Sequence, residues 1–182
     1  MMKCKMFIQM QNKKNKIILG IDPGYDRVGI AILEKENNKE NLIYSECFET
    51  DKKLIYQERL LLIGNKIGKI INKFKPKKLA IETLLFSKNT KTALRVAESR
   101  GVIIFEAAKK SLVISEYNPN SIKLAVTGYG KSDKKQIISM INRIFNIKQN
   151  MTARKAEIKY DDEYDAIAVA LTCAVTRKED CL

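Results

Sequence analysis

The sequence predicts an α/β fold, with a central mixed five-stranded sheet flanked by helices. Three short apolar runs follow one another closely near the start of the chain, and amphipathic stretches with 3–4 spacing then alternate with further short apolar runs. The 182 residues suit a single domain, and the chain has no internal repeat. The composition, 45% hydrophobic and 30% charged, excludes a mainly disordered chain. No apolar run approaches the roughly 18 residues of a membrane-spanning helix.

The first three strands are predicted at residues 17–21, 28–33 and 42–48. Asp22-Pro23-Gly24 predicts a turn after the first strand, and the polar residues 34–41 predict a hairpin loop between the second and third. Strands joined this closely favour an antiparallel meander. Residues 1–15 have no clear periodicity, and we expect them to be a basic, disordered extension or to precede the true functional start.

The rest of the chain is predicted to alternate helices with two more strands. Apolar residues spaced three and four apart predict an amphipathic helix over 53–74, which Lys75-Pro76 ends. The later elements are a strand at 79–82, a helix at 90–110 interrupted by Gly101, a strand at 112–117, a short helix at 119–126, a glycine-containing loop at 127–133, a helix at 134–145, a polar connection at 146–160 and a last helix at 161–176.

The charge of the chain favours a polyanionic partner. There are 34 basic and 21 acidic residues, a net charge of +13. Five of the lysines lie in residues 1–16, which contain no acid, so the remainder still carries +8. This excess indicates nucleic acid before a membrane surface, the alternative being a general bias toward lysine. The N-terminus has no secretory signal, so we expect a cytoplasmic protein with free thiols.

The residue types present narrow the chemistry. The chain contains no histidine, which excludes Ser–His and Cys–His triads, His-ligated metal sites and an imidazole general base. Its four cysteines show neither a C-x-x-C pair nor the spacing of a zinc site. Any catalysis must therefore depend on carboxylates, lysines, hydroxyls or thiols.

Four carboxylates lie where predicted elements begin or end. Asp22 and Glu82 close two strands, while Asp162 and Asp165 open the last helix three residues apart, on one face. Like charges that converge in this way need cations, and all-oxygen ligands select Mg²⁺ or Mn²⁺ over zinc. Two such ions about 4 Å apart can activate a water and stabilise the leaving oxygen of a phosphodiester.

Each carboxylate also has a purely structural interpretation. Asp22 before Pro-Gly is a common turn residue, and the acids from Asp161 to Asp165 could cap a helix and complement its dipole. Glu82 is harder to explain in this way, because residues 79–85 are otherwise apolar and a buried, unpaired carboxylate is costly.

Two groups of residues are candidates for nucleic-acid contacts. The apolar tip at Leu84, Leu85 and Phe86, followed by Ser87, Lys88 and Asn89, could wedge between bases or stack on them. A loop that packs on its own core is the alternative. Four lysines on the short helix and around the glycine-containing loop could contact phosphates, or form a solvated face: Lys123, Lys131, Lys134 and Lys135.

Five segments together resemble the RuvC family of Holliday junction resolvases. They are IILGIDPGYDRVGIAIL, RLLLIGNKIGKIINKFKPKKLAIE, SKNTKTALRVAESRGVI, GYGKSDKKQI and YDDEYDAIAVALTCA, and they occur in the order and spacing of the family over residues 17–174. The first segment is shared with other RNase H-like proteins. The long helix running into AIE, the KN…AL…RG pattern and D-x-x-D-A are much more specific.

The resemblance implies an RNase H-like nuclease domain over residues 16–178 that nicks two opposed strands of a four-way DNA junction in recombination and repair. It implies a homodimer built on the helix with Arg100-Gly101, and RuvA–RuvB as possible branch-migration partners. It also implies two Mg²⁺ ions per subunit, for which Mn²⁺ can substitute. The metal-binding acids correspond to Asp22, Glu82, Asp162 and Asp165, with Asp161 as the helix cap. Our hypothesis for the mechanism is that Asp22 and Asp165 bind the attacking water, while Glu82 and Asp162 help to hold the second ion. Lys123 and Lys134 correspond to lysines that act on the scissile phosphate.

The chain departs from the family pattern in three places. The position of the base-stacking phenylalanine is Leu85, so either Phe86 acts through a shifted loop or an aliphatic wedge replaces the ring. Some relatives carry a histidine near the last aspartates, and here activation of the water must rest on the metal or a lysine. The extension at residues 1–15 is also atypical.

Three other functions remain as alternatives. Another RNase H-like nuclease, for example one that processes RNA, is disfavoured by the segment 84–89 and by the length of the chain. A junction-binding scaffold without catalysis is disfavoured because all four acids are present. An actin-like phosphotransferase would need a second phosphate-binding glycine motif, which the sequence lacks.

Overall fold

The computed structural model describes residues 16–37, 39–84, 90–147, 158 and 160–176. Within them five strands form one sheet in the order β3-β2-β1-β4-β5. The strands are β1 (Lys16–Asp22), β2 (Arg27–Glu36), β3 (Lys39–Glu49), β4 (Lys78–Glu82) and β5 (Val113–Tyr117). The first three pair antiparallel, while β4 and β5 add in parallel to β1. The predicted α/β fold with a mixed five-stranded sheet is confirmed.

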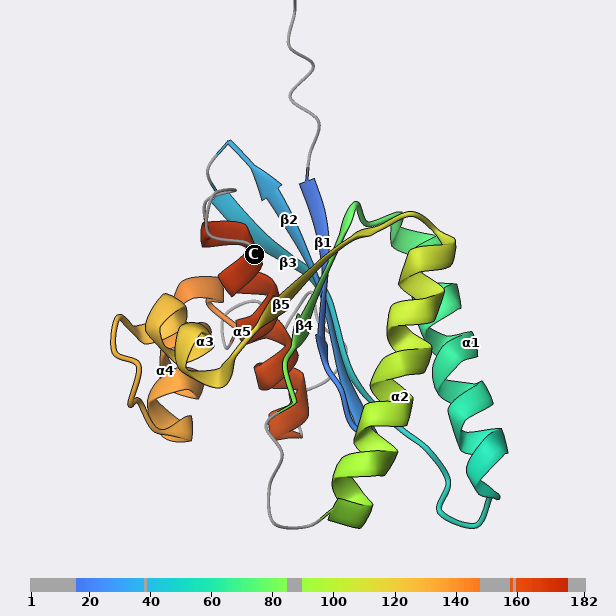
Figure 1. Cartoon of the computed structure of the whole chain (residues 1–182). Helices are drawn as coiled ribbons and strands as arrows, with labels where there is room; N and C mark the ends of the chain where they lie inside the picture. Colours follow the sequence, from blue (N-terminus) through green and yellow to red (C-terminus); the bar gives the residue numbers. More distant parts are fainter. Residues whose placement is uncertain (1–15, 38, 85–89, 148–157, 159, 177–182) are drawn as a thin grey trace, which may run out of the picture.

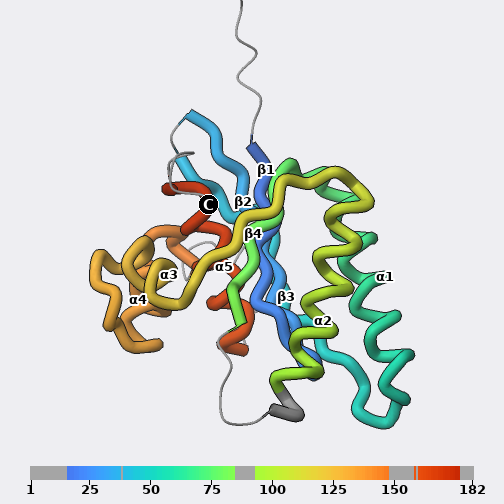
Figure 2. The backbone as a smooth tube through the Cα atoms, viewed as in Figure 1, coloured from blue at the N-terminus to red at the C-terminus, as the bar shows by residue number. Residues whose placement is uncertain are grey.

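Helices cover both faces of this sheet (Figure 1). They are α1 (Tyr56–Phe74), α2 (Thr90–Lys109), α3 (Pro119–Thr127), α4 (Lys134–Phe145) and α5 (Asp161–Val175). Helices α1 and α2 lie on one face, and α3, α4 and α5 lie on the other, as the backbone trace also shows (Figure 2). No helix in the described part of the chain is long and apolar enough to cross a membrane.

Three details of the predicted elements are wrong. Asp161 is not the cap of α5, because the extended residue Tyr160 holds that position and Asp161 already belongs to the first turn. The polar residues 34–41 are mostly not a loop, because Glu34, Lys35 and Glu36 pair with residues of β3; Asn37, with φ of 49°, follows the end of β2. The ladder is made by main-chain groups, which polar residues supply as well as apolar ones. Helix α2 runs unbroken through Gly101, since one glycine leaves the hydrogen bonding of a helix intact. The extension at 1–15 and most of the connection at 146–160 lie outside the described residues.

Strand alternation divides the core into two layers. Leu19 and Ile21 of β1 face α1 and α2, where they join buried isoleucines such as Ile67. The residues between them face α5, so Gly20 and Asp22 lie on the same side of the sheet as Ala80 of β4. The alternation therefore directs the predicted catalytic side chains of β1 and β4 toward α5.

Two glycines allow α5 to lie unusually close to the sheet. A Cβ atom on Gly20 would lie 2.5 Å from the carbonyl oxygen of Ala166, and one on Gly29 would lie 1.9 Å from that of Asp162. Since real Cβ atoms do not approach backbone so closely, only glycine fits at these two positions. The start of α5 is thereby held directly against β1 and β2.

Candidate active site

The ends of two parallel strands and the start of one helix meet at one edge of the sheet. Ile21 is in register with Ile81, so Asp22 and Glu82 close β1 and β4 side by side. Asp22 is also paired with Gly29, whose backbone lies against the first turn of α5. This contact brings Asp162 and Asp165 toward Asp22. Carboxylates from three distant parts of the chain thus lie around one point.

The electrostatics of the site show that these carboxylates repel one another. Burial, followed by the negative charges of Asp165, Glu82 and Asp162, raises the pKa of Asp22 to about 8 from its ordinary value of 3.8. Burial and the charge of Asp165 also raise the pKa of Glu82, and burial raises the pKa of Asp165. A site that disfavours its own negative charge in this way suits a bound cation.

Two basic side chains provide part of the compensating charge. Arg27 Nε lies 3.2 Å from Asp162 Oδ2, and Lys134 Nζ donates to Asp165 Oδ2 at 2.9 Å and lies 3.4 Å from Asp161 Oδ2. Burial lowers the pKa of Lys134, but the hydrogen bonds and charges of Asp165 and Asp161 together raise it more, so the net shift is upward.

Ion pairs occupy two of the four carboxylates, Asp162 and Asp165. Among the residues that the structure describes, no group of three or more His, Cys, Asp or Glu side chains is arranged to hold a metal ion. The donor set nevertheless fits Mg²⁺ or Mn²⁺, because it consists of carboxylate oxygens alone and its mutual repulsion is relieved by a cation.

Lys123 and Lys134 lie beside the carboxylates. Together with Glu82 and Asp165 they line a cavity of about 270 Å³ between α3, α4 and α5. Lys134 is held at the first position of α4 by a capping box, in which Asp133 accepts from the backbone of Gln136 and the Gln136 side chain accepts from the backbone of Asp133. Both lysines can therefore reach an anion placed at the carboxylates.

The other predicted nucleic-acid contacts are not brought to this point. Lys135 lines a separate cavity of about 440 Å³ with Tyr129 and Arg143, and Lys131 is exposed on the loop between α3 and α4. The predicted base-contacting residues Leu85, Phe86, Lys88 and Asn89 lie outside the described residues.

Three residues near the carboxylates were missed by the sequence reasoning. Arg100 Nε donates to the main-chain oxygen of Glu82 at 3.3 Å, and its guanidinium pairs with Glu116 of β5, so α2 supports the end of β4. Arg27 and Cys47 lie beside Asp162. Burial, then the charge of Asp162, raises the pKa of Cys47 to about 12, which keeps the thiol protonated. Of these three residues, only Arg100 belongs to a sequence pattern singled out above, the one assigned to the helix of the expected dimer interface.

Comparisons with known proteins agree with this geometry. The family model described as crossover junction endodeoxyribonuclease RuvC matches residues 18–173. The RuvC of Ruminiclostridium cellulolyticum is 40% identical over 155 residues, which cover 85% of this chain and 89% of the relative. That of Thermosipho melanesiensis is 40% identical over 158 residues, covering 87% and 96%.

Solved structures show the same fold. T. thermophilus RuvC in complex with Holliday junction substrate superposes with a TM-score of 0.76 at 25% sequence identity, covering 86% of this chain and 92% of that one. The yeast mitochondrial Holliday junction resolvase Ydc2 superposes with a TM-score of 0.64 at 14% identity, covering 87% and 78%, a likeness of fold alone.

Proposed function

This chain belongs to the RuvC family of crossover junction endodeoxyribonucleases, and we propose that its active site is the group of four carboxylates at the ends of β1 and β4 and the start of α5. The protein is a hydrolase that resolves Holliday junctions. One observation carries the assignment of the site: Gly29, paired with Asp22, touches the first turn of α5 and so brings Asp162 beside the strand ends.

The proposed cofactor is a pair of Mg²⁺ ions per subunit, with Mn²⁺ able to replace them. The support is a donor set of four carboxylates without histidine, together with the raised pKa of Asp22 and Glu82. When bound, these ions lower the pKa of a water molecule and stabilise the leaving oxygen of the phosphodiester. The carboxylates hold the ions and orient them toward the DNA strand that is cut.

The lysines are proposed to act on the scissile phosphate. Lys123 and Lys134 line the same cavity as Glu82 and Asp165, so their ammonium groups can donate to phosphate oxygens placed there. Lys134 is paired with Asp165 in this structure, and the same ammonium can also donate to a phosphate, since it carries three protons.

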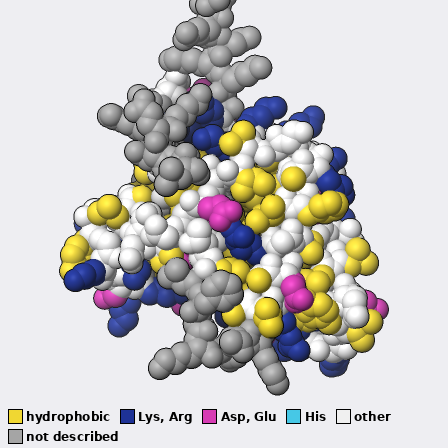
Figure 3. All heavy atoms as spheres, viewed as in Figure 1, with side chains coloured by type: hydrophobic (Ala, Val, Ile, Leu, Met, Phe, Trp, Pro, Cys, Tyr) yellow, Lys and Arg dark blue, Asp and Glu magenta, His cyan; other side chains and the backbone are white. Residues whose placement is uncertain are grey.

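A homodimer would match the symmetry of a four-way junction, since it provides one active site for each of two opposed strands. We propose that α2 forms its interface. Leu94, Gly101 and Phe105 lie on one face of this helix, at spacings of seven and four residues. The two large side chains are 61% and 62% exposed, and hydrophobic side chains gather on the right half of the face shown in Figure 3, over α2. Cooperation with RuvA–RuvB in the cytoplasm belongs to the same proposal.

The test compares the protein with Asp22→Asn on a mobile four-way junction, a linear duplex and an RNA–DNA hybrid, each with Mg²⁺ and with Ca²⁺. We expect paired symmetric nicks only in the junction with Mg²⁺, at a rate at least about 10³-fold lower in Asp22→Asn while junction binding survives. The matched control is Asp51→Asn, which removes an exposed carboxylate between β3 and α1 and should cut normally. Tight binding without cutting would indicate a scaffold, and cutting of the hybrid a different substrate.

A further inference from the structure

A second cavity lies on the other side of the carboxylates. It measures about 370 Å³, and its lining includes Tyr25, Arg27, Arg95 and Asp162. It shares no lining residue with the cavity of Lys123 and Lys134, yet each cavity contains one carboxylate of α5. The candidate active site therefore lies between two cavities. The proposed mechanism uses only the cavity lined by Lys123 and Lys134.

A buried arginine supports the wall of this cavity through its contacts with Tyr25 and Asp26. Arg59 is only 5% exposed, and its guanidinium carbon lies 3.8 Å from the centre of the Tyr25 ring. It donates to Thr50 Oγ1 at 2.8 Å and to the main-chain oxygen of Tyr25 at 3.3 Å, and it pairs with Asp26. This pairing lowers the pKa of Asp26, so the carboxylate stays ionised and compensated.

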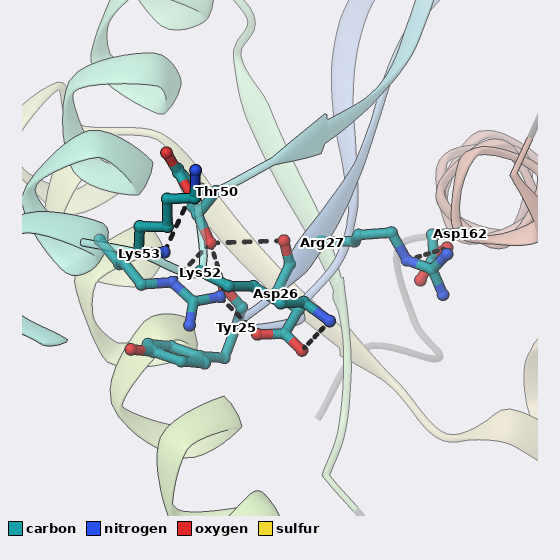
Figure 4. A network of polar contacts seen from close by, with 9 residues as sticks. Tyr25, Asp26, Arg27, Thr50, Lys52, Lys53 and Asp162 are labelled. Atoms are coloured by element: carbon teal, nitrogen blue, oxygen red, sulfur yellow. Dashed lines mark hydrogen bonds and ion pairs between the residues drawn. The ribbon is translucent and has the colours of Figure 1, made fainter. Parts of the chain in front are cut away.

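The charges in and directly behind the cavity favour an anion. Arg27 reaches across it to Asp162, as Figure 4 shows, and Lys52 gives Asp26 a second cation at 3.6 Å. Arg95 is exposed, with its guanidinium carbon 5.4 Å from the centre of the Tyr25 ring. Among the described residues no carboxylate lies within ion-pair distance of Arg95. The charged lining residues are thus Arg27, Arg95, Asp26 and Asp162; both aspartates are already paired with cations, which leaves the charge of Arg95 without an ion-pair partner among the described residues.

We infer that this cavity is a second phosphate subsite, which holds a phosphodiester of the cleaved strand next to the scissile one, with Arg95 as its direct ligand. The inference rests on the proposed function. A DNA strand whose scissile phosphate lies at the carboxylates must continue past them on both sides. The cavity of Lys123 and Lys134 lies on only one of these sides. The second cavity lies on the other flank, is large enough for a group of nucleotide size, and presents a planar guanidinium suited to phosphate oxygens.

The first experiment measures junction binding with Ca²⁺ over a range of salt concentrations, and junction cutting with Mg²⁺. Arg95→Gln should weaken binding about tenfold and make the slope of log K against log salt shallower by about one. Arg95→Lys should recover most of this loss. Lys110→Gln removes the same charge just beyond the other end of α2 and should change binding less than about twofold. Equal effects of Arg95→Gln and Lys110→Gln would overturn the inference.

The second experiment identifies the phosphate. Junctions carry a single neutral methylphosphonate at successive positions beside the cleavage site. At one position on the flank away from the lysines, the substitution should weaken binding of the unaltered protein about tenfold and leave binding by Arg95→Gln unchanged. If the two losses add at every position, Arg95 contacts no phosphate and the inference fails.

The two proposals fail in different ways. A protein that cuts no junction refutes the proposed active site, whereas normal junction cutting and binding by Arg95→Gln refute only the subsite. Arg95 is exposed, and the buried hydrogen bonds of this wall belong to Arg59, so Arg95→Gln is expected to fold. If it does not, Arg95→Met takes its place in the methylphosphonate series, because that variant also lacks the charge.

Discussion

The two faces of the sheet are packed in different ways. Toward α1 and α2 the core is built from large aliphatic side chains such as Leu19, Ile67 and Ile103, which separate helix and strand by full side-chain layers. Toward α5 large side chains such as Leu33 and Ile167 are also buried, but at Gly20 and Gly29 the backbones of sheet and helix nearly touch. The first face keeps helix and strand apart, and the second brings carboxylates together.

This difference shows how one small domain separates stability from positioning. Large side chains maximise the apolar area removed from water, but their packing tolerates small changes in the distance between helix and sheet. A glycine-to-backbone contact contributes little burial and allows only one distance between helix and strand. The residues that define the site, Asp22 and Asp162, lie on the face covered by α5, which we call the close face. Mutations on the two faces should therefore have separable consequences.

The largest expected effect concerns the charge concentrated on the close face. Because the native pKa of Asp22 is about 8 and its ordinary value is 3.8, the native protein retains a proton that the unfolded chain releases between these values. Without metal, stability should therefore fall as the pH rises from about 4 to about 8. Asp22→Asn, which cannot ionise, should be more stable than the parent at pH 8 by an amount on the order of several kcal/mol. Urea unfolding in EDTA at pH 5, 6.5 and 8 measures this difference, and a difference independent of pH would contradict it.

The next effect concerns the aliphatic face. Ile67 is fully buried between α1 and the sheet, so Ile67→Ala should lower the free energy of unfolding by about 2–5 kcal/mol. The junction cleavage rate of the folded protein, measured well below its melting temperature, should stay within about twofold of the parent. Leu61→Ala, on the same helix but 64% exposed, is the control and should change stability by no more than about 0.5 kcal/mol. A large loss of cleavage in folded Ile67→Ala would show that the faces are not separable.

The smallest effect in free energy concerns the close contact itself. Gly29→Ala places a methyl group 1.9 Å from the carbonyl oxygen of Asp162, so the start of α5 must move. Cleavage should fall about 100-fold, while junction binding with Ca²⁺ changes less than about threefold. Gly130→Ala is the matched control, because its Cβ would make only an ordinary contact of 3.6 Å with Asn120. Unchanged cleavage by Gly29→Ala would mean that the spacing of α5 does not set the site.

The sequence alone determined the elements and the chemistry that they can support. Hydrophobic periodicity is a local property, so most of the strands and helices were predictable. The absence of histidine and the position of four acids at element ends defined an all-carboxylate donor set. The family motifs then indicated a junction resolvase, and the comparisons support this.

Only the tertiary structure decided the distances between residues far apart in the chain. The pairing of Arg27 with Asp162, the support of Glu82 by Arg100 and the seating of α5 on Gly29 depend on how elements dock against one another. The extension of β2 and β3 into residues 34–41 was missed for a related reason, because these strand ends are held by main-chain hydrogen bonds to each other rather than by a pattern of apolar side chains. Local sequence determines what a segment can form, whereas packing between segments determines which charges meet.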